Sequence, residues 1–192
     1  MPATASVWPG ALQRLVNRAA HEVRNSLNGV AVNLEVVRTR SAREGTPAAA
    51  VALFATSAAE QFERLTRQVE AVLALSRPPV EPLDVARVLQ QLVDLLAGGG
   101  SGGDVSVVVS PECSGATTTS VAGDLARAVL ADAVMSTLVV GHATSWSVRC
   151  AGGTVRCEVA APAPVMLDAR THVAAGAAAI RWTDGAVDFP AA

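Results

Sequence analysis

The chain has 192 residues, of which 51% are hydrophobic and 17% are charged, so it can bury a core and lacks the composition of a disordered protein. All fifteen basic residues are arginines, and the absence of lysine excludes a Walker-type phosphate loop and Schiff-base chemistry, which both need a lysine amine. A net charge of -2, 3% aromatic residues and no tyrosine argue against a nucleic-acid partner.

No apolar run reaches the ~18–20 residues that cross a bilayer, and the N-terminus lacks the pattern of a signal peptide, so we expect a cytoplasmic protein that does not bind a membrane. The charge is divided unevenly. Residues 1–79 hold nine arginines and six glutamates, whereas residues 80–192 hold six arginines and eleven acidic residues. The mildly basic first part suits an acidic pocket on a partner.

The first element is a predicted helix from about residue 8 or 11 to residue 43. Apolar residues recur along it at helical spacing and predict a buried seam: Val16, Ala20, Val23, Leu27, Val30, Leu34 and Val37. His21 lies off this seam, and Arg24, Asn25 and Asn28 follow it at offsets of three, four and seven residues, on the same helix face. A histidine there is placed to react with something that docks from outside.

Residues 44–47 supply a glycine, a threonine cap and a proline between two helices. The second helix is predicted to end before Pro78-Pro79, and it carries its own apolar repeat at Val51, Ala58, Leu65 and Val72. Two such helices cannot cover both stripes against each other, so we expect two hairpins to pair as a homodimeric four-helix bundle.

The stretch from His21 to Val30 resembles the H-box of bacterial two-component sensor histidine kinases, with Ser26 in place of the usual proline. In that family the histidine is phosphorylated, the next acidic residue accepts a proton, and an amide or hydroxyl four residues on positions water for dephosphorylation. The resemblance therefore implies these roles for His21, Glu22 and Asn25. Arg14, Arg18, Arg24 and Asn28 are the candidate residues for docking a partner.

The second part of the chain begins near residue 81. Its pattern predicts a helix at 85–96, a flexible glycine run at 98–103, a strand at 105–109, a helix at 124–140, a hairpin at 145–150 and 154–160, a helix at 171–179 and a strand at 186–189. This order is an α/β sandwich and resembles a shrunken histidine-kinase ATP-binding domain. The predicted fold class is thus α+β, with a helical dimerisation and phosphotransfer domain at 1–80 and a degenerate ATPase-like domain at 81–192.

The nucleotide-binding groups of that family are missing. Asp132 and Ser136 stand where the family has two asparagines, and residues 160–164 replace its glycine-containing adenine loop. The sequence therefore predicts no cofactor and no resident metal, with Mg²⁺ expected only on the partner. Asp132 is expected to be a surface carboxylate. Cys113, Cys150 and Cys157 show no metal-ligand spacing and are expected to be reduced thiols.

These features favour a histidine phosphotransfer protein of a phosphorelay, which passes phosphoryl groups through His21 to or from the receiver domains of response regulators. Such an enzyme would be a phosphotransferase without ATP-dependent kinase activity. Three alternatives remain open: an active sensor histidine kinase or a fragment of one, a non-catalytic dimeric scaffold, and a receiver phosphatase that uses Asn25.

Overall fold

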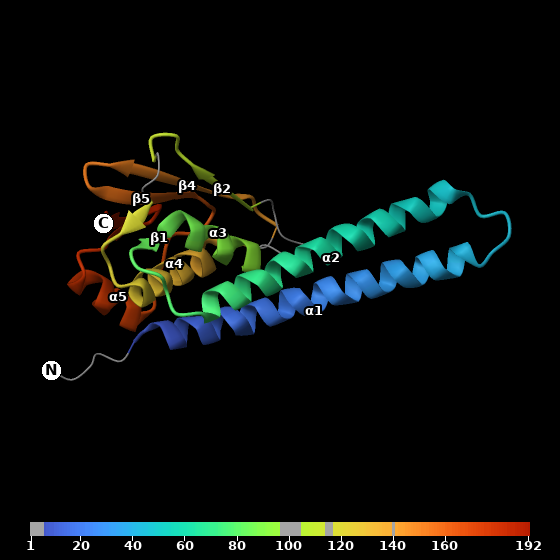
Figure 1. Ribbon diagram of the computed structural model, residues 1–192, viewed down its shortest axis with the longest axis horizontal. Helices are drawn as coiled ribbons and strands as arrows, with labels where there is room; N and C mark the ends of the chain where they lie inside the picture. Colours follow the sequence, from blue (N-terminus) through green and yellow to red (C-terminus); the bar gives the residue numbers. More distant parts are fainter. Residues whose placement is uncertain (1–5, 97–104, 114–116, 140) are drawn as a thin grey trace.

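A long helical hairpin and a small α/β unit make up the chain (Figure 1), in a computed structural model that describes residues 6–96, 105–113, 117–139 and 141–192. The hairpin consists of α1 (Trp8–Ser41) and α2 (Ala48–Ser76), and both predicted helices are confirmed. A proline stands in the first turn of α1, and α2 ends ahead of Pro78. The connector turns at Gly45, whose φ of 77° is a left-handed conformation that glycine adopts without strain.

The predicted seam of α1 is not buried within the chain, and this expectation was wrong for a single copy. The exposed fractions of Val16, Leu27 and Leu34 are 40%, 50% and 53%. The buried side of α1 carries a different set of residues: Trp8, Ala11, Leu15, Ala19 and Ser26. A helix in a two-helix hairpin has only one close neighbour along most of its length, so one stripe packs inward and the other faces solvent.

The α/β unit contains a five-stranded sheet in the order β2-β4-β5-β7-β6, in which β2 runs parallel to β4 and the other pairs are antiparallel. The predicted order of elements is confirmed, and the glycine run at 98–103 lies outside the described residues. The short strands β1, β3 and β6 are additions to the prediction. The elements are β1 (Leu83–Asp84), α3 (Val85–Leu96), β2 (Val105–Val109), β3 (Thr118–Thr119), α4 (Gly123–Thr137), β4 (Thr144–Ala151), β5 (Thr154–Ala160), α5 (Ala169–Ala177), β6 (Arg181–Thr183) and β7 (Ala186–Pro190).

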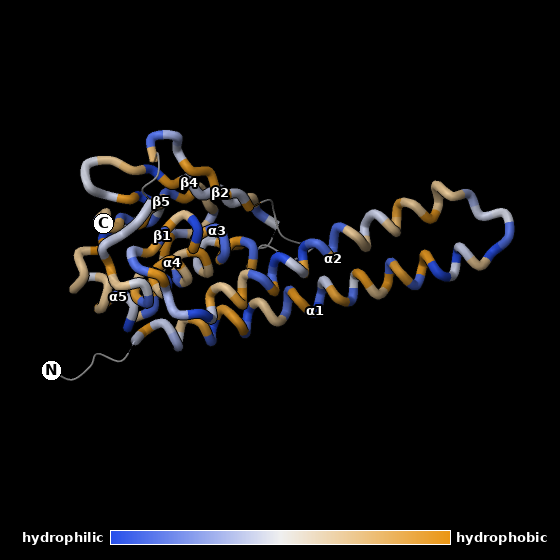
Figure 2. The backbone as a smooth tube through the Cα atoms, in the orientation of Figure 1, coloured by the Kyte–Doolittle hydropathy of each residue, from blue (hydrophilic) through white to orange (hydrophobic). Residues whose placement is uncertain are grey.

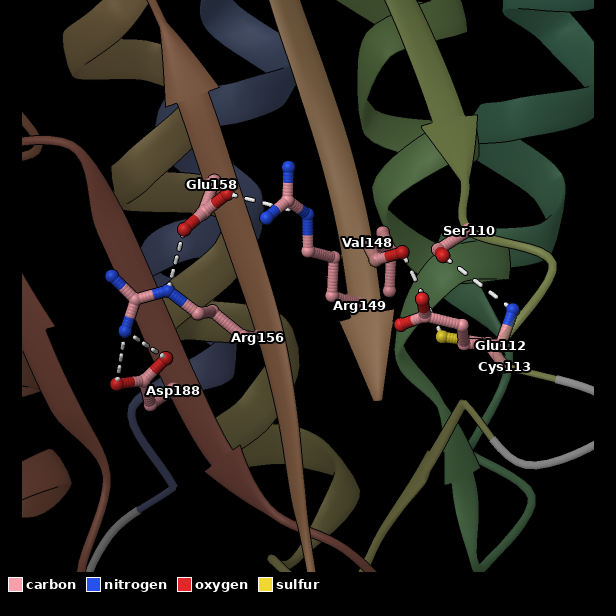
Figure 3. Close-up of polar contacts among 8 residues, drawn as sticks. All are labelled: Ser110, Glu112, Cys113, Val148, Arg149, Arg156, Glu158 and Asp188. Carbon is pink, nitrogen blue, oxygen red and sulfur yellow. Dashed lines mark hydrogen bonds and ion pairs between the residues drawn. The ribbon is translucent and has the colours of Figure 1, made fainter. Parts of the chain in front are cut away.

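One face of the sheet packs on helices and the other faces solvent. Trp146 and Phe189 are fully buried on the inner side, in one cluster with residues of α3 and α4. The outer side carries charged residues of β4, β5 and β7 (Figure 3), where Arg156 pairs with Glu158 at 2.8 Å and with Asp188 at 3.0 Å. This alternation of apolar and charged positions is typical of a sheet that is covered on one side only.

The cysteines differ from expectation. The β4–β5 register places Cys150 opposite Val155 and Cys157 opposite Val148. However, Cys113, which follows β2, forms a disulfide with Cys150, and their Cα atoms are 5.1 Å apart. The expectation that all three thiols are reduced is therefore wrong for this pair, because the parallel pairing of β2 with β4 brings together two residues 37 positions apart. Cys157 is free and buried.

Several polar contacts fix the base of the hairpin to the α/β unit. Arg127 of α4 donates a hydrogen bond to the carbonyl oxygen of Arg77 at 2.7 Å, and its guanidinium lies over the ring of Trp8. The backbone N–H of Gly123, at the start of α4, donates to Glu81 at 3.0 Å. The far part of the hairpin projects away from the α/β unit (Figure 1). No helix among the described residues is long and apolar enough to cross a membrane.

Candidate functional site

His21 lies on the solvent-exposed side of α1. Arg24, Asn25 and Asn28 are also exposed and follow it at helical spacing, so the structure gathers these four residues on one face. Residues three or four apart on a helix have Cβ atoms about 5–6 Å from each other, which brings Arg24 and Asn25 within side-chain reach of the imidazole. The predicted reactive face is thus formed by local helix geometry alone.

Glu22 is turned away from that open face. It is half-buried, and its Oε2 atom is buried without a hydrogen-bond partner among the described residues. One helical step rotates a side chain by about 100°, so Glu22 points toward the inner side of α1 while His21 points outward. A buried carboxylate oxygen without a partner is costly, and it is available as an acceptor when a nearby N–H turns toward it.

Two of the predicted docking residues are engaged within the chain. Arg14 donates a hydrogen bond to the carboxylate of Asp132 at 2.7 Å and lies 3.9 Å from that of Asp168. Arg18 donates to the carbonyl oxygens of Met135 at 2.8 Å and Leu138 at 3.0 Å. Both guanidinium groups are therefore bound to α4 and to the segments next to it. Arg24 and Asn28 remain the exposed docking candidates.

Asp132 is not a surface carboxylate, and that expectation was wrong. Its side chain is 5% exposed, and its two oxygens accept from Arg14 and from the backbone N–H of Asp168 at 3.1 Å. Ser136, one turn later, donates to the carbonyl of Ala133 and accepts from the backbone N–H of Met166, each at 2.9 Å. Both positions therefore hold the segment that follows β5 against α4.

This arrangement does not fit a nucleotide with its metal. The oxygens of Asp132 are used by protein donors, and its charge is compensated by Arg14. A cleft of about 930 Å³ lies nearby, between the first turns of α1 and the starts of α4 and α5. Its charged lining residues are two aspartates and two arginines, so it has no excess of positive charge for a polyphosphate: Arg14, Asp124, Asp168 and Arg170.

The tie between α4 and the segment before α5 is a part of the structure that sequence reasoning missed. Asp168 caps α5 by accepting from the backbone N–H of Arg170, and its own N–H binds Asp132. The aspartate before a helix is a local signal for the cap. The pairing with a residue 36 positions away has no local signal. Among the described residues, no group of three or more histidine, cysteine or acidic side chains could hold a metal ion.

Comparison with protein-family models gives no match, and comparison with curated proteins gives none either.

Proposed function

We propose that the protein is a histidine phosphotransfer protein, in which His21 accepts a phosphoryl group from the aspartate of a receiver domain and returns it to such an aspartate. The observation that carries the proposal is the exposed face of α1, where a histidine that fills no core lies beside an arginine and two amides. A rigid helix holds these groups in fixed relation to a docking partner, and phosphoryl transfer depends mainly on such positioning.

The chemical step requires little from this chain. A neutral imidazole nitrogen of His21 attacks phosphorus, the N–P bond forms, and the P–O bond to the partner aspartate breaks, so the carboxylate leaves with the electron pair. The other ring nitrogen then gives up its proton, to Glu22 after a side-chain rotation or to water. Mg²⁺ belongs to the receiver domain and neutralises the charge of the phosphoryl group there.

We further propose that the protein works as a homodimer. The exposed apolar residues of α1 continue onto α2, where Phe62, Val69 and Leu73 are 59%, 48% and 55% exposed and recur at helical spacing. Figure 2 shows hydrophobic positions alternating with polar ones along the projecting part of both helices. Apolar stripes of this length on a soluble hairpin are typical of an interface, and a second hairpin of the same kind covers them in a four-helix bundle.

The alternatives differ in their use of nucleotide and of His21. An active kinase would need the Asp132 region to bind Mg-ATP, and the contacts of Arg14 and Asp168 with that carboxylate argue against it. A non-catalytic scaffold would not depend on His21 at all. A receiver phosphatase would depend on Asn25 more than on His21.

The test is transfer from phosphorylated receiver domains to the intact protein. Radiolabelled phosphate should move to the parent protein and to a His172→Ala control, because His172 lies on α5 and outside the α1 face, and it should not move to His21→Ala. Loss of His21 removes an exposed side chain, so the variant should keep the parent's melting temperature and oligomeric state. Equal transfer to the parent and to His21→Ala would refute the proposal.

A further inference from the structure

Arg18 joins the reactive face of α1 to the end of α4. Its guanidinium donates to the carbonyl oxygens of Met135 and Leu138, at 2.8 and 3.0 Å. Met135 belongs to the last turn of α4 and Leu138 is its C-cap, so these are carbonyls that a helix leaves without intrahelical partners. The planar guanidinium reaches both at once, which a lysine amine on a flexible stem does less well.

The residues just after this anchor are exposed. Val139 has 38% of its surface accessible, and the backbone N–H of His142 donates to its carbonyl at 3.1 Å. His142 is exposed as well. Arg18 precedes His21 by three residues, so the two side chains lie on neighbouring turns of one helix face. The end of α4 is thereby bound to a residue that precedes His21 by about one helical turn.

We propose that Val139 and His142 form one continuous docking surface with His21, Arg24 and Asn28, and that a single receiver domain covers all of it. This inference rests on the function proposed above. A standard protein interface covers about 800 Å² on each partner, and a patch of that area has a radius of about 16 Å. A receiver domain centred on His21 therefore extends past Arg18 to the end of α4. There the carbonyl oxygen of Leu138 lies 3.0 Å from the guanidinium of Arg18.

The parts of this surface differ in their tasks. His21 reacts, Arg24 and Asn28 present polar groups, and Val139 gives an apolar contact that selects a receiver with an apolar side chain opposite it. Arg18 is a positioning residue, because it fixes the distance between the two halves without facing the phosphoryl group. Losing either Val139 or Arg18 should weaken docking and leave the chemical step of the docked complex unchanged.

The experiment compares Val139→Asp with Val108→Asp. Val108 is a matched control because it is a valine that is 58% exposed and lies on β2, an edge strand of the sheet. Transfer from a phosphorylated receiver to the intact protein is measured as KM and kcat. Val139→Asp should raise KM at least tenfold with kcat within twofold of the parent, and Val108→Asp should match the parent. Arg18→Ala should also raise KM, and Arg18→Lys should recover part of the loss.

Labelling by phosphoramidate, a small donor that needs no docking surface, separates the possible failures. All four variants should be labelled on His21 at the parent's rate, which shows that the imidazole and the fold are intact. A KM within twofold of the parent for Val139→Asp overturns the docking surface and leaves the proposed function standing. If no receiver transfers phosphate to the parent protein, the proposed function fails and this inference fails with it.

Discussion

The guanidinium of Arg14 lies 2.7 Å from the buried carboxylate of Asp132, which joins the first helix of the hairpin to the fourth helix of the chain. The carboxylate is 5% exposed, whereas the Arg14 side chain is 41% exposed. Asp132 stands at a position where the resemblance implies a metal-binding side chain. In this protein the positive charge that compensates the carboxylate of Asp132 comes from Arg14.

Arg14→Ala should destabilise the protein by about 1–3 kcal/mol, because it leaves a buried carboxylate without its charged partner. The double variant Arg14→Ala/Asp132→Asn should recover much of the loss, since the amide carries no charge and its oxygen can still accept from Asp168. Denaturant unfolding measures both values. Arg38→Ala is the control: it breaks an ion pair with Glu35 whose side chains are 76% and 59% exposed, and it should cost little. Equal costs for Arg14→Ala and Arg38→Ala would contradict this account of Asp132.

Mg-ATP should not bind. The oxygens of Asp132 and the hydroxyl of Ser136 already hold Asp168 and Met166, and the nearby cleft has balanced charges. Titration calorimetry on the intact protein should give no heat up to millimolar Mg-ATP. A micromolar dissociation constant would restore the kinase alternative.

Phe62→Glu should convert a dimer to a monomer, because it places a charge in the apolar stripe that we propose a second copy covers. Light scattering at micromolar concentration measures the mass, and the circular dichroism of the monomer should stay helical. Leu53→Glu is the matched control. Leu53 is 71% exposed on the same helix but lies about 180° around the axis from Phe62, so its variant should remain dimeric. A monomeric parent protein would remove the basis for the bundle.

The native protein should show no thiol that reacts with an alkylating reagent. Cys113 and Cys150 are bonded to each other, and burial raises the pKa of the Cys157 thiol to about 12, with a smaller contribution from the negative charge of Asp188. A thiol with a raised pKa is protonated and unreactive at neutral pH, and reactivity should appear only as the pH approaches that value or as the protein unfolds. Mass spectrometry after unfolding without reductant should find one alkylated cysteine. Three alkylated cysteines would show that the disulfide is absent.

Glu22→Gln should slow phosphotransfer by about 10²–10⁴-fold, the range for loss of a general base, if Glu22 takes the ring proton. Asn25→Ala should leave transfer close to the parent's rate and lengthen the lifetime of the phosphorylated partner. Gel electrophoresis of reactions that are stopped at successive times measures both the rate of phosphotransfer and the lifetime of the phosphorylated partner. A Glu22→Gln rate equal to the parent's would mean that water takes the proton and that Glu22 has no chemical role.

Local patterns predicted the parts of the fold that local rules determine. Apolar spacing and the prolines at 47 and 78 predicted the two long helices, and the pattern at 145–150 and 154–160 predicted the β4–β5 hairpin. The exposed position of His21 also followed from helical periodicity. Contacts between distant segments were beyond these rules. The pairing of Arg14 with Asp132, 118 positions apart, and of Cys113 with Cys150 depends on how the hairpin and the strands come together.

The seam of α1 shows the same division. Periodicity identified apolar positions such as Leu27, but it could not tell whether the covering surface belongs to this chain or to a second copy. Within one chain, α2 and the α/β unit cover the side that carries Ala11, Leu15 and Ala19 instead. Contacts with α2 and the α/β unit therefore decide which of the two adjacent stripes of α1 is buried, and no local pattern in α1 indicates which one it is.

The most direct test of the central claim is the site of phosphate after the protein is incubated with a phosphorylated cognate receiver domain. Mass spectrometry under conditions that preserve phosphohistidine should find the modification on His21 alone, and addition of an unphosphorylated receiver should remove it. Phosphate on His142 or His172, or on no histidine with any receiver tested, would contradict the assignment of His21 as the phosphoacceptor.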